Sequence, residues 1–231
     1  MDVKIFNSAK EACTAVAKLL AVKAIEGGNI AVSGGSTPKL LFQIIGEEYK
    51  NTDWSRLNFF WVDERMVPEN DRESNYGEFF RTLLIQGVIS EKNVFPVWYY
   101  QDELRSLAEY TLTIRNKLPF ENELPHFDLI LLGMGEDGHT ASIFPGNLSS
   151  FTSEHFVERA IHPQTKQHRI TLTGSAINNA EQVIFLVTGE SKTEILKKVI
   201  LEKDAKLPAA HVNPVSGNLV YFLGGIGNAI I

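Results

Sequence analysis

Residues 127–146 read FDLILLGMGEDGHTASIFPG and pass from an apolar run into a glycine-rich segment. Positions 127–132 hold five large apolar residues and one Asp without alternation, which is typical of a parallel strand buried on both faces. The following turn contains Asp137 and His139. Ligands in open α/β sheets bind beyond the carboxyl ends of strands, so we expect an active centre here. A capped turn with a hydrogen-bonded histidine would be the purely structural alternative.

Composition restricts the possible classes of protein. The chain has 231 residues, 44% of them hydrophobic, which is ample for a substantial core. Its 22 Lys and Arg against 28 Asp and Glu give a net charge of −6, which argues against general nucleic-acid or anionic-membrane binding and leaves room for a small cationic pocket. No secretion signal or membrane-length apolar run is visible, so we expect a cytoplasmic protein. A single cysteine, Cys13, excludes an internal disulfide and is expected to be a packing residue.

A second strand and loop occur near the amino end. Residues 29–33 (NIAVS) form a short apolar strand, and 34–38 (GGSTP) lead into a helix over 39–49. Pro38 suits the first turn of that helix, with Ser36 or Thr37 as the N-cap. Backbone N–H groups at such a turn attract phosphate. The pattern is neither a Walker loop nor GxGxxG, and a tight strand-to-helix turn would also explain it.

Charged residues follow two further strands. Residues 57–62 (LNFFWV) run directly into the segment 63–65 (DER), and residues 182–188 (QVIFLVT) end at 189–192 (GESK) before a helix to about residue 201. Surface ion pairing would explain the first group equally well. The second places Lys192 in a helix's first turn, where the macrodipole disfavours a cation unless an anion is present.

The remaining pattern alternates helices and strands. We expect helices over 8–27, from Ser74 onward, over 102–118 and over 174–181, an edge strand at 94–97, and further strands at 168–173 and 218–223. This alternation predicts an α/β fold in which residues 1–231 form one doubly wound domain. Its sheet would be mostly parallel, with helices on both faces.

If these loops share one edge of the sheet, they collect cations beside an acid and a histidine. Arg65, Arg169 and Lys192 would then surround Asp137 and His139, which suits a phosphorylated small molecule such as a sugar phosphate. Neither HExxH nor GxSxG occurs, which argues against zinc-protease and serine-hydrolase chemistry. Asp137 and His139 alone are too few ligands for a metal site.

Several segments together resemble the 6-phosphogluconolactonase family, which is related to the glucosamine-6-phosphate deaminases. Their order and spacing span most of the chain. The matching segments are 33–38 (SGGSTP), 63–68 (DERMVP), Ser74 with Asn75, 133–142 (GMGEDGHTAS), 144–146 (FPG), 169–173 (RITLT), and Gly189 with Lys192.

The resemblance implies hydrolysis of 6-phosphoglucono-1,5-lactone to 6-phosphogluconate in the oxidative pentose phosphate pathway, without a metal or organic cofactor. It implies that His139 is the general base, that Asp137 orients groups near it, and that Arg65 takes part in catalysis or substrate binding. Either Arg65 or backbone N–H groups would stabilise the oxyanion. The expected substrate and phosphate contacts are Gly34, Gly35, Ser36, Thr37, Ser74, Asn75, Arg169 and Lys192. We expect a small-molecule partner only, and a monomer or weak homodimer.

Three other functions are compatible with parts of the pattern. A deaminase or isomerase of the same fold would act on an amino or keto sugar phosphate, but those enzymes carry a glutamate five residues after the histidine, where this chain has Phe144. A non-catalytic effector-binding module would keep the phosphate loop without a base, and no DNA-binding segment supports that reading. An unrelated nucleotide binder would require a Rossmann or Walker fingerprint, which is absent.

Overall fold

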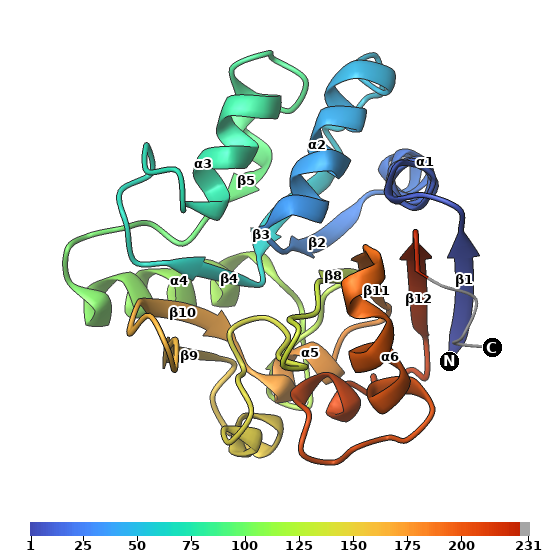
Figure 1. The fold of residues 1–231 in the computed structure, drawn as a ribbon. Coiled ribbons are helices and arrows are strands. Elements are labelled where there is room, and N and C mark those ends of the chain that lie inside the picture. The colour runs from blue at the N-terminus through green and yellow to red at the C-terminus, as the bar shows by residue number, and fades with distance from the viewer. Residues whose placement is uncertain (227–231) are drawn as a thin grey trace.

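A parallel sheet forms the centre of the computed structural model, which describes residues 1–226 (Figure 1). Every neighbouring pair of its strands is parallel. This confirms the predicted sheet. In spatial order the seven strands are β1 (Asp2–Phe6), β12 (Leu219–Gly224), β11 (Val183–Thr188), β8 (Leu129–Leu132), β2 (Gly28–Val32), β3 (Leu57–Trp61) and β5 (Val94–Phe95).

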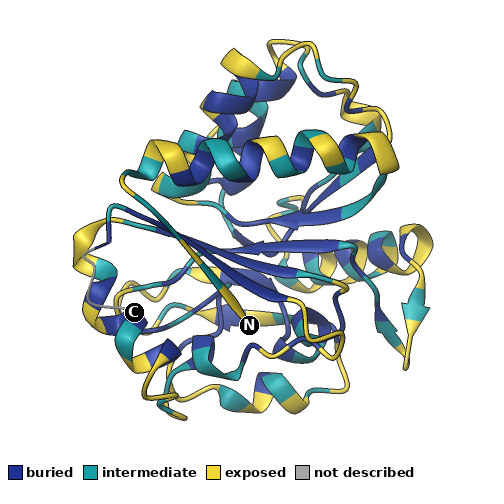
Figure 2. Cartoon of the chain, turned by 90° about the vertical axis from the view of Figure 1, so that its right-hand side faces the viewer, coloured by how far each residue is buried: buried dark blue, intermediate teal, exposed yellow. Residues whose placement is uncertain are grey.

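Helices cover both faces of this sheet, as the sequence predicted (Figures 1 and 2). One face carries α1 (Ala9–Glu26), α2 (Ser36–Glu48) and α3 (Asn75–Phe79), and the other carries α4 (Glu103–Lys117), α5 (Gly174–Asn178) and α6 (Thr193–Ile200). Within residues 1–226, no helix combines the length and the apolar composition needed to cross a bilayer.

The central strands of the sheet are almost continuously buried, as the dark blue ribbons of Figure 2 show, whereas the edge strand β1 has no buried residue. All four residues of β8 are buried, and so are all six of β12. Helices cover both faces of these strands, which explains why their sequences are apolar without interruption. Cys13 of α1 is also fully buried, and burial raises the pKa of its thiol to about 11.

The winding of the sheet reverses between β2 and β8. From β2 the chain proceeds outward through β3 to β5, and it then returns to the other side of β2 as β8. The loops that follow these two adjacent strands therefore diverge and leave a crevice at their carboxyl ends. The segments 33–37 and 133–139 are these loops, which explains why their polar residues meet.

A smaller antiparallel sheet lies beside the crevice and consists of β4 (Asp63–Arg65), β10 (His168–Leu172) and β9 (Val157–Ile161). The sequence predicted 63–65 as a loop, which was wrong, because this short segment pairs with β10. It also gave no indication of β1, β9 or the hairpin of β6 (Phe120–Glu121) and β7 (Leu124–Pro125). The short 3₁₀ and π segments are η1 (Phe80–Leu84), η2 (Glu91–Asn93), η3 (Leu148–Thr152), η4 (Glu190–Lys192) and η5 (Pro208–His211).

Two predicted helix starts need correction. The N-cap of α2 is Gly35, with φ of 108°, whereas Ser36 or Thr37 was expected. Gly35 can adopt this left-handed backbone, so the helix begins at Ser36 and not after it. Lys192 was expected inside a first turn, but it ends η4 and is the N-cap of α6.

A buried tyrosine joins α4 to the end of β3. The hydroxyl of Tyr110 donates to the Trp61 carbonyl at 2.6 Å and accepts the Trp61 N–H at 2.9 Å. Tyr110 and Trp61 are 2% and 0% exposed. One side chain thus satisfies two buried backbone groups at a strand end beside the crevice.

We expect Tyr110→Phe to lower the free energy of unfolding by about 2–4 kcal/mol, because it leaves two buried backbone groups without a partner. Urea unfolding followed by circular dichroism would measure the change. Tyr99→Phe, at a half-buried tyrosine, is the matched control. A loss below about 1 kcal/mol would show that the Trp61 groups find other partners.

Candidate active site

A cavity of about 230 Å³ opens over the carboxyl ends of β2 and β8. It brings together most of the residues that the sequence singled out. Asp137 does not line it directly but holds His139, and Ser74 lines an adjoining cavity of about 160 Å³. The predicted residues that line the main cavity are Gly34, Gly35, Ser36, Thr37, Arg65, Asn75, His139, Arg169 and Lys192.

His139 is oriented by Asp137. The Nδ1 atom lies 2.5 Å from Asp137 Oδ1, and the same oxygen accepts the His139 backbone N–H at 3.1 Å. Burial opposes ionisation of Asp137, but the hydrogen bonds and charge of His139 outweigh it, so the pKa of Asp137 is lowered. A carboxylate can only accept here, so Nδ1 carries the proton. Neutral His139 therefore has its lone pair on Nε2, as a general base requires.

Gly135 makes this orientation possible by leaving space beside the imidazole. A Cβ atom at Gly135 would lie 2.1 Å from His139 Nδ1 and 2.6 Å from Asp137 Oδ1. No side chain fits there without displacing the pair. Two residues after His139, Ala141 lines the cavity with φ of 52°, a left-handed backbone that is unfavourable for alanine.

An aromatic ring shields one side of His139. The Phe144 ring centroid lies 5.0 Å from that of His139, and His162 lies 5.0 Å from Phe144. Phe144 is 6% exposed, and the Arg169 guanidinium lies 5.8 Å from its ring centroid. The phenyl ring therefore places apolar surface against one side of the imidazole.

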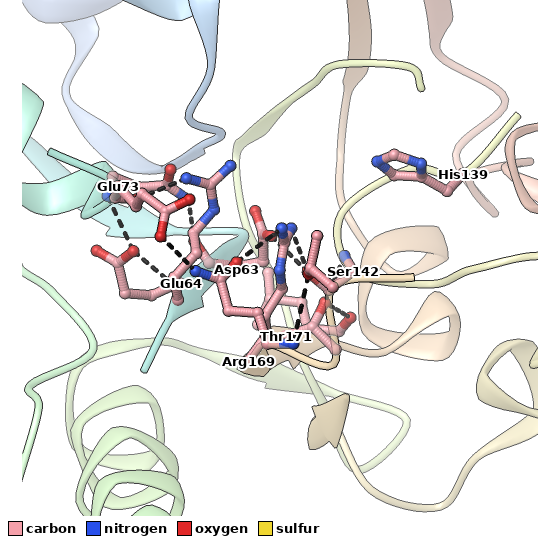
Figure 3. Close-up of polar contacts among 12 residues, drawn as sticks. Asp63, Glu64, Glu73, His139, Ser142, Arg169 and Thr171 are labelled. Carbon is pink, nitrogen blue, oxygen red and sulfur yellow. Dashed lines mark hydrogen bonds and ion pairs between the residues drawn. The ribbon is translucent and has the colours of Figure 1, made fainter. Parts of the chain in front are cut away.

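A buried network beneath the cavity holds Arg169, as Figure 3 shows. Asp63 Oδ2 accepts the Ser142 hydroxyl at 2.6 Å and lies 3.6 Å from Arg169 Nη1. Ser142 in turn donates its backbone N–H to Thr171 Oγ1 at 3.1 Å. Burial lowers the pKa of Arg169, and the opposite charge of Asp63 counteracts this effect. Arg169 is thereby retained as a buried cation.

Arg65 and Arg169 stand directly opposite each other in the β4 and β10 ladder, and both line the cavity. Like charges at opposed positions destabilise a sheet unless something neutralises them. Asp63 provides one neutralising charge. Lys192 adds a third cation and lies 4.0 Å from Glu136 at the rim. The cavity is therefore suited to an anion.

The start of α2 contributes backbone donors to the same cavity. Gly35, Ser36 and Thr37 line it at the amino end of a 13-residue helix, where the first N–H groups have no partner within the helix. The Thr37 and Thr188 hydroxyls are 2.8 Å apart and connect α2 to β11. Phosphate binding at such a helix end follows from its dipole and its free N–H groups.

Asn75 fixes the glycine loop from the opposite side. Its Nδ2 donates to the Asp63 carbonyl at 2.8 Å, and a Cβ atom at Gly34 would lie only 1.8 Å from its Oδ1. The neighbouring Ser74 caps α3, because its Oγ accepts the Gly77 N–H at 2.9 Å. Asn75 thus faces the cavity, whereas the Ser74 hydroxyl stabilises the helix.

Sequence reasoning missed the residues that support the cations. Asp63 and Ser142 both belong to the motif segments, and an acid directly after a buried strand was a usable signal for Asp63. Their hydrogen bond joins residues 79 positions apart, so the spacing of the motifs could not predict it. No cluster of three or more His, Cys, Asp or Glu suited to a metal ion occurs in residues 1–226.

The chain matches the family model described as glucosamine-6-phosphate isomerases/6-phosphogluconolactonase over residues 6–221. A 6-phosphogluconolactonase of Treponema pallidum is 41% identical over 180 residues, which cover 78% of this chain and 75% of the relative. The solved 6-phosphogluconolactonase of Trypanosoma brucei superposes with a TM-score of 0.85 at 30% identity, over 96% of this chain and 95% of that one. The chain belongs to the glucosamine-6-phosphate isomerase/6-phosphogluconolactonase family.

Proposed function

We propose that this protein hydrolyses 6-phospho-D-glucono-1,5-lactone to 6-phospho-D-gluconate, the lactonase step of the oxidative pentose phosphate pathway. The names of its relatives support the reaction. The observation that carries the proposal is that His139, held by Asp137, lines the same cavity as Arg65, Arg169 and Lys192. Hydrolysis of a phosphorylated lactone requires a base for the attacking water and, beside it, a site that binds the phosphate.

Hydrolysis needs an attacking water and a place for its proton. His139 Nε2 takes a proton from water as the oxygen attacks the lactone carbonyl carbon. The tetrahedral intermediate then collapses, the ring C–O bond breaks, and the imidazolium returns its proton to the departing ring oxygen. Asp137 stabilises the imidazolium through Nδ1. General-base assistance of this kind is worth about 10²- to 10⁴-fold.

The cations and the amino end of α2 have two further roles, which are to bind the phosphate and to stabilise the negative charge on the carbonyl oxygen. Lys192, Arg169 and the N–H groups of residues 35–37 suit the phosphate. Arg65 or a backbone N–H would stabilise the oxyanion. Neither role requires a metal ion or an organic cofactor.

A deaminase or isomerase is the second candidate, because the family includes both activities. Opening and isomerising an amino sugar needs several ordered proton transfers. Phe144, where the deaminases carry a glutamate, packs against His139 and cannot exchange protons. This favours the lactonase.

We expect His139→Gln to lower kcat by at least about 10²-fold with little change in substrate binding, because general-base assistance acts chiefly in the transition state. Steady-state lactone hydrolysis, corrected for the spontaneous reaction, measures it. His155→Gln, at an exposed histidine, is the matched control. A folded His139→Gln protein with wild-type kcat would remove His139 from the mechanism.

Lys192→Ala and Arg65→Ala should each raise KM by about 10- to 150-fold, which corresponds to the loss of one charge-assisted hydrogen bond. Inorganic phosphate should compete with the lactone in the wild-type protein. Lys198→Ala on the exposed side of α6 is the control for charge removal. Equal turnover of unphosphorylated gluconolactone at low concentration would argue against a phosphate site.

Product analysis separates the two activities of the family. We expect 6-phosphogluconate from freshly generated lactone, detected by coupled oxidation, because His139 is the one base that the reaction needs. Glucosamine 6-phosphate should yield neither ammonia nor fructose 6-phosphate above the blank. Ammonia release at a rate comparable to lactone turnover would overturn the assignment and the role given to Phe144.

A further inference from the structure

Glu64 is a buried acid that the proposed mechanism does not use. It lies between Asp63 and Arg65 on β4 and is 2% exposed. Strand alternation directs its side chain away from the cavity that both neighbours line. A carboxylate is seldom buried so fully without partners that compensate for its lost hydration.

The Glu64 carboxylate accepts four hydrogen bonds. Oε1 accepts the backbone N–H groups of Arg65 at 2.7 Å and Asn75 at 2.9 Å. Oε2 accepts the Tyr76 N–H at 2.8 Å and the Ser74 hydroxyl at 3.1 Å. Figure 3 shows Glu64 beside Asp63, with dashed lines at its carboxylate. One side chain therefore connects β4 to the first residues of α3.

Two of these partners contribute side chains to the cavity. Arg65 and Asn75 both line it, although they lie ten positions apart in the chain. Asn75 also contacts the glycine loop at Gly34 and bonds the Asp63 carbonyl. A displacement of Glu64 would therefore move a cation, an amide and the loop at the α2 amino end together.

We propose that Glu64 is a positioning residue, which sets the distance between Arg65 and Asn75 and thereby shapes the anion-binding side of the cavity. The inference rests on the proposed lactonase function only for its kinetic readout. Glu64 makes no contact with the cavity, so its effect is exerted through the backbone of these two residues.

The four hydrogen-bond partners determine which side chain can occupy position 64 and hold Arg65 and Asn75 in place. Each of them donates a hydrogen, so both oxygens must accept. Burial raises the pKa of Glu64 to about 7, the three backbone N–H donors oppose this shift, and the charge of Asp63 adds to it. A glutamine has the same shape, but its amide NH₂ must face either the Arg65 and Asn75 N–H groups or the Tyr76 N–H. Donor would then meet donor in a buried site.

The test is the kinetics of Glu64→Gln with the phosphorylated lactone. We expect KM to rise by about 10- to 100-fold, the range for a lost charge-assisted contact. kcat should fall by a smaller factor than KM rises, because His139 and Asp137 belong to the loop after β8 and general-base help is separable from binding. A purely structural role would reduce the folded fraction and so lower kcat at unchanged KM.

Glu47→Gln makes the same chemical change at an exposed position of α2 and should match the wild type. In a double-mutant cycle, Asn75→Ala should add little to the KM of Glu64→Gln, because both substitutions act on the position of the Asn75 side chain in the cavity.

If Glu64→Gln does not fold, Ser74→Ala removes one donor to Oε2 and should also raise KM. An active wild type with unchanged KM in the folded variants refutes the role of Glu64, whereas an inactive wild type refutes the proposed function.

Discussion

The adjacency of β2 and β8 is the constraint on which the rest of the structure depends. Both strands are buried, so their polar continuations have to emerge at the carboxyl edge, and the reversal of winding there separates the two loops. The phosphate-suited start of α2 and the His139 loop face each other for that reason. Ser33, at the end of β2, ties the two strands further by donating to the Leu131 carbonyl at 2.8 Å.

The small antiparallel sheet adds what the parallel sheet cannot supply. A parallel strand end delivers one loop, whereas the β4 and β10 ladder places Arg65 and Arg169 side by side in fixed register. Holding two cations so close has an electrostatic cost that Asp63 reduces and a bound anion would reduce further. His139 stands on the loop after β8, so the histidine and the cations reach the cavity from different elements, which the Ser142 to Asp63 hydrogen bond connects.

The sequence allowed the sheet, its helices and the cavity-lining residues to be predicted because each depends on local patterns. Uninterrupted apolar runs marked β8 and β11, and glycines followed by polar residues marked the loops. The supporting contacts could not be predicted in the same way. Asp63 with Ser142, and Glu64 with the start of α3, depend on which strands become neighbours. β4 was missed because three charged residues carry no strand periodicity.

Ala141 introduces backbone strain into the loop that carries His139. Its backbone has φ of 52°, a conformation that costs an alanine roughly 1–2 kcal/mol relative to a right-handed one. The isolated Thr140 to Ile143 bridge and the buried Ser142 hold it there. The loop is thus a preorganised but costly element, and substitutions that relax it would exchange activity for thermal tolerance. Selection for heat resistance in this protein would therefore act against the segment that carries His139.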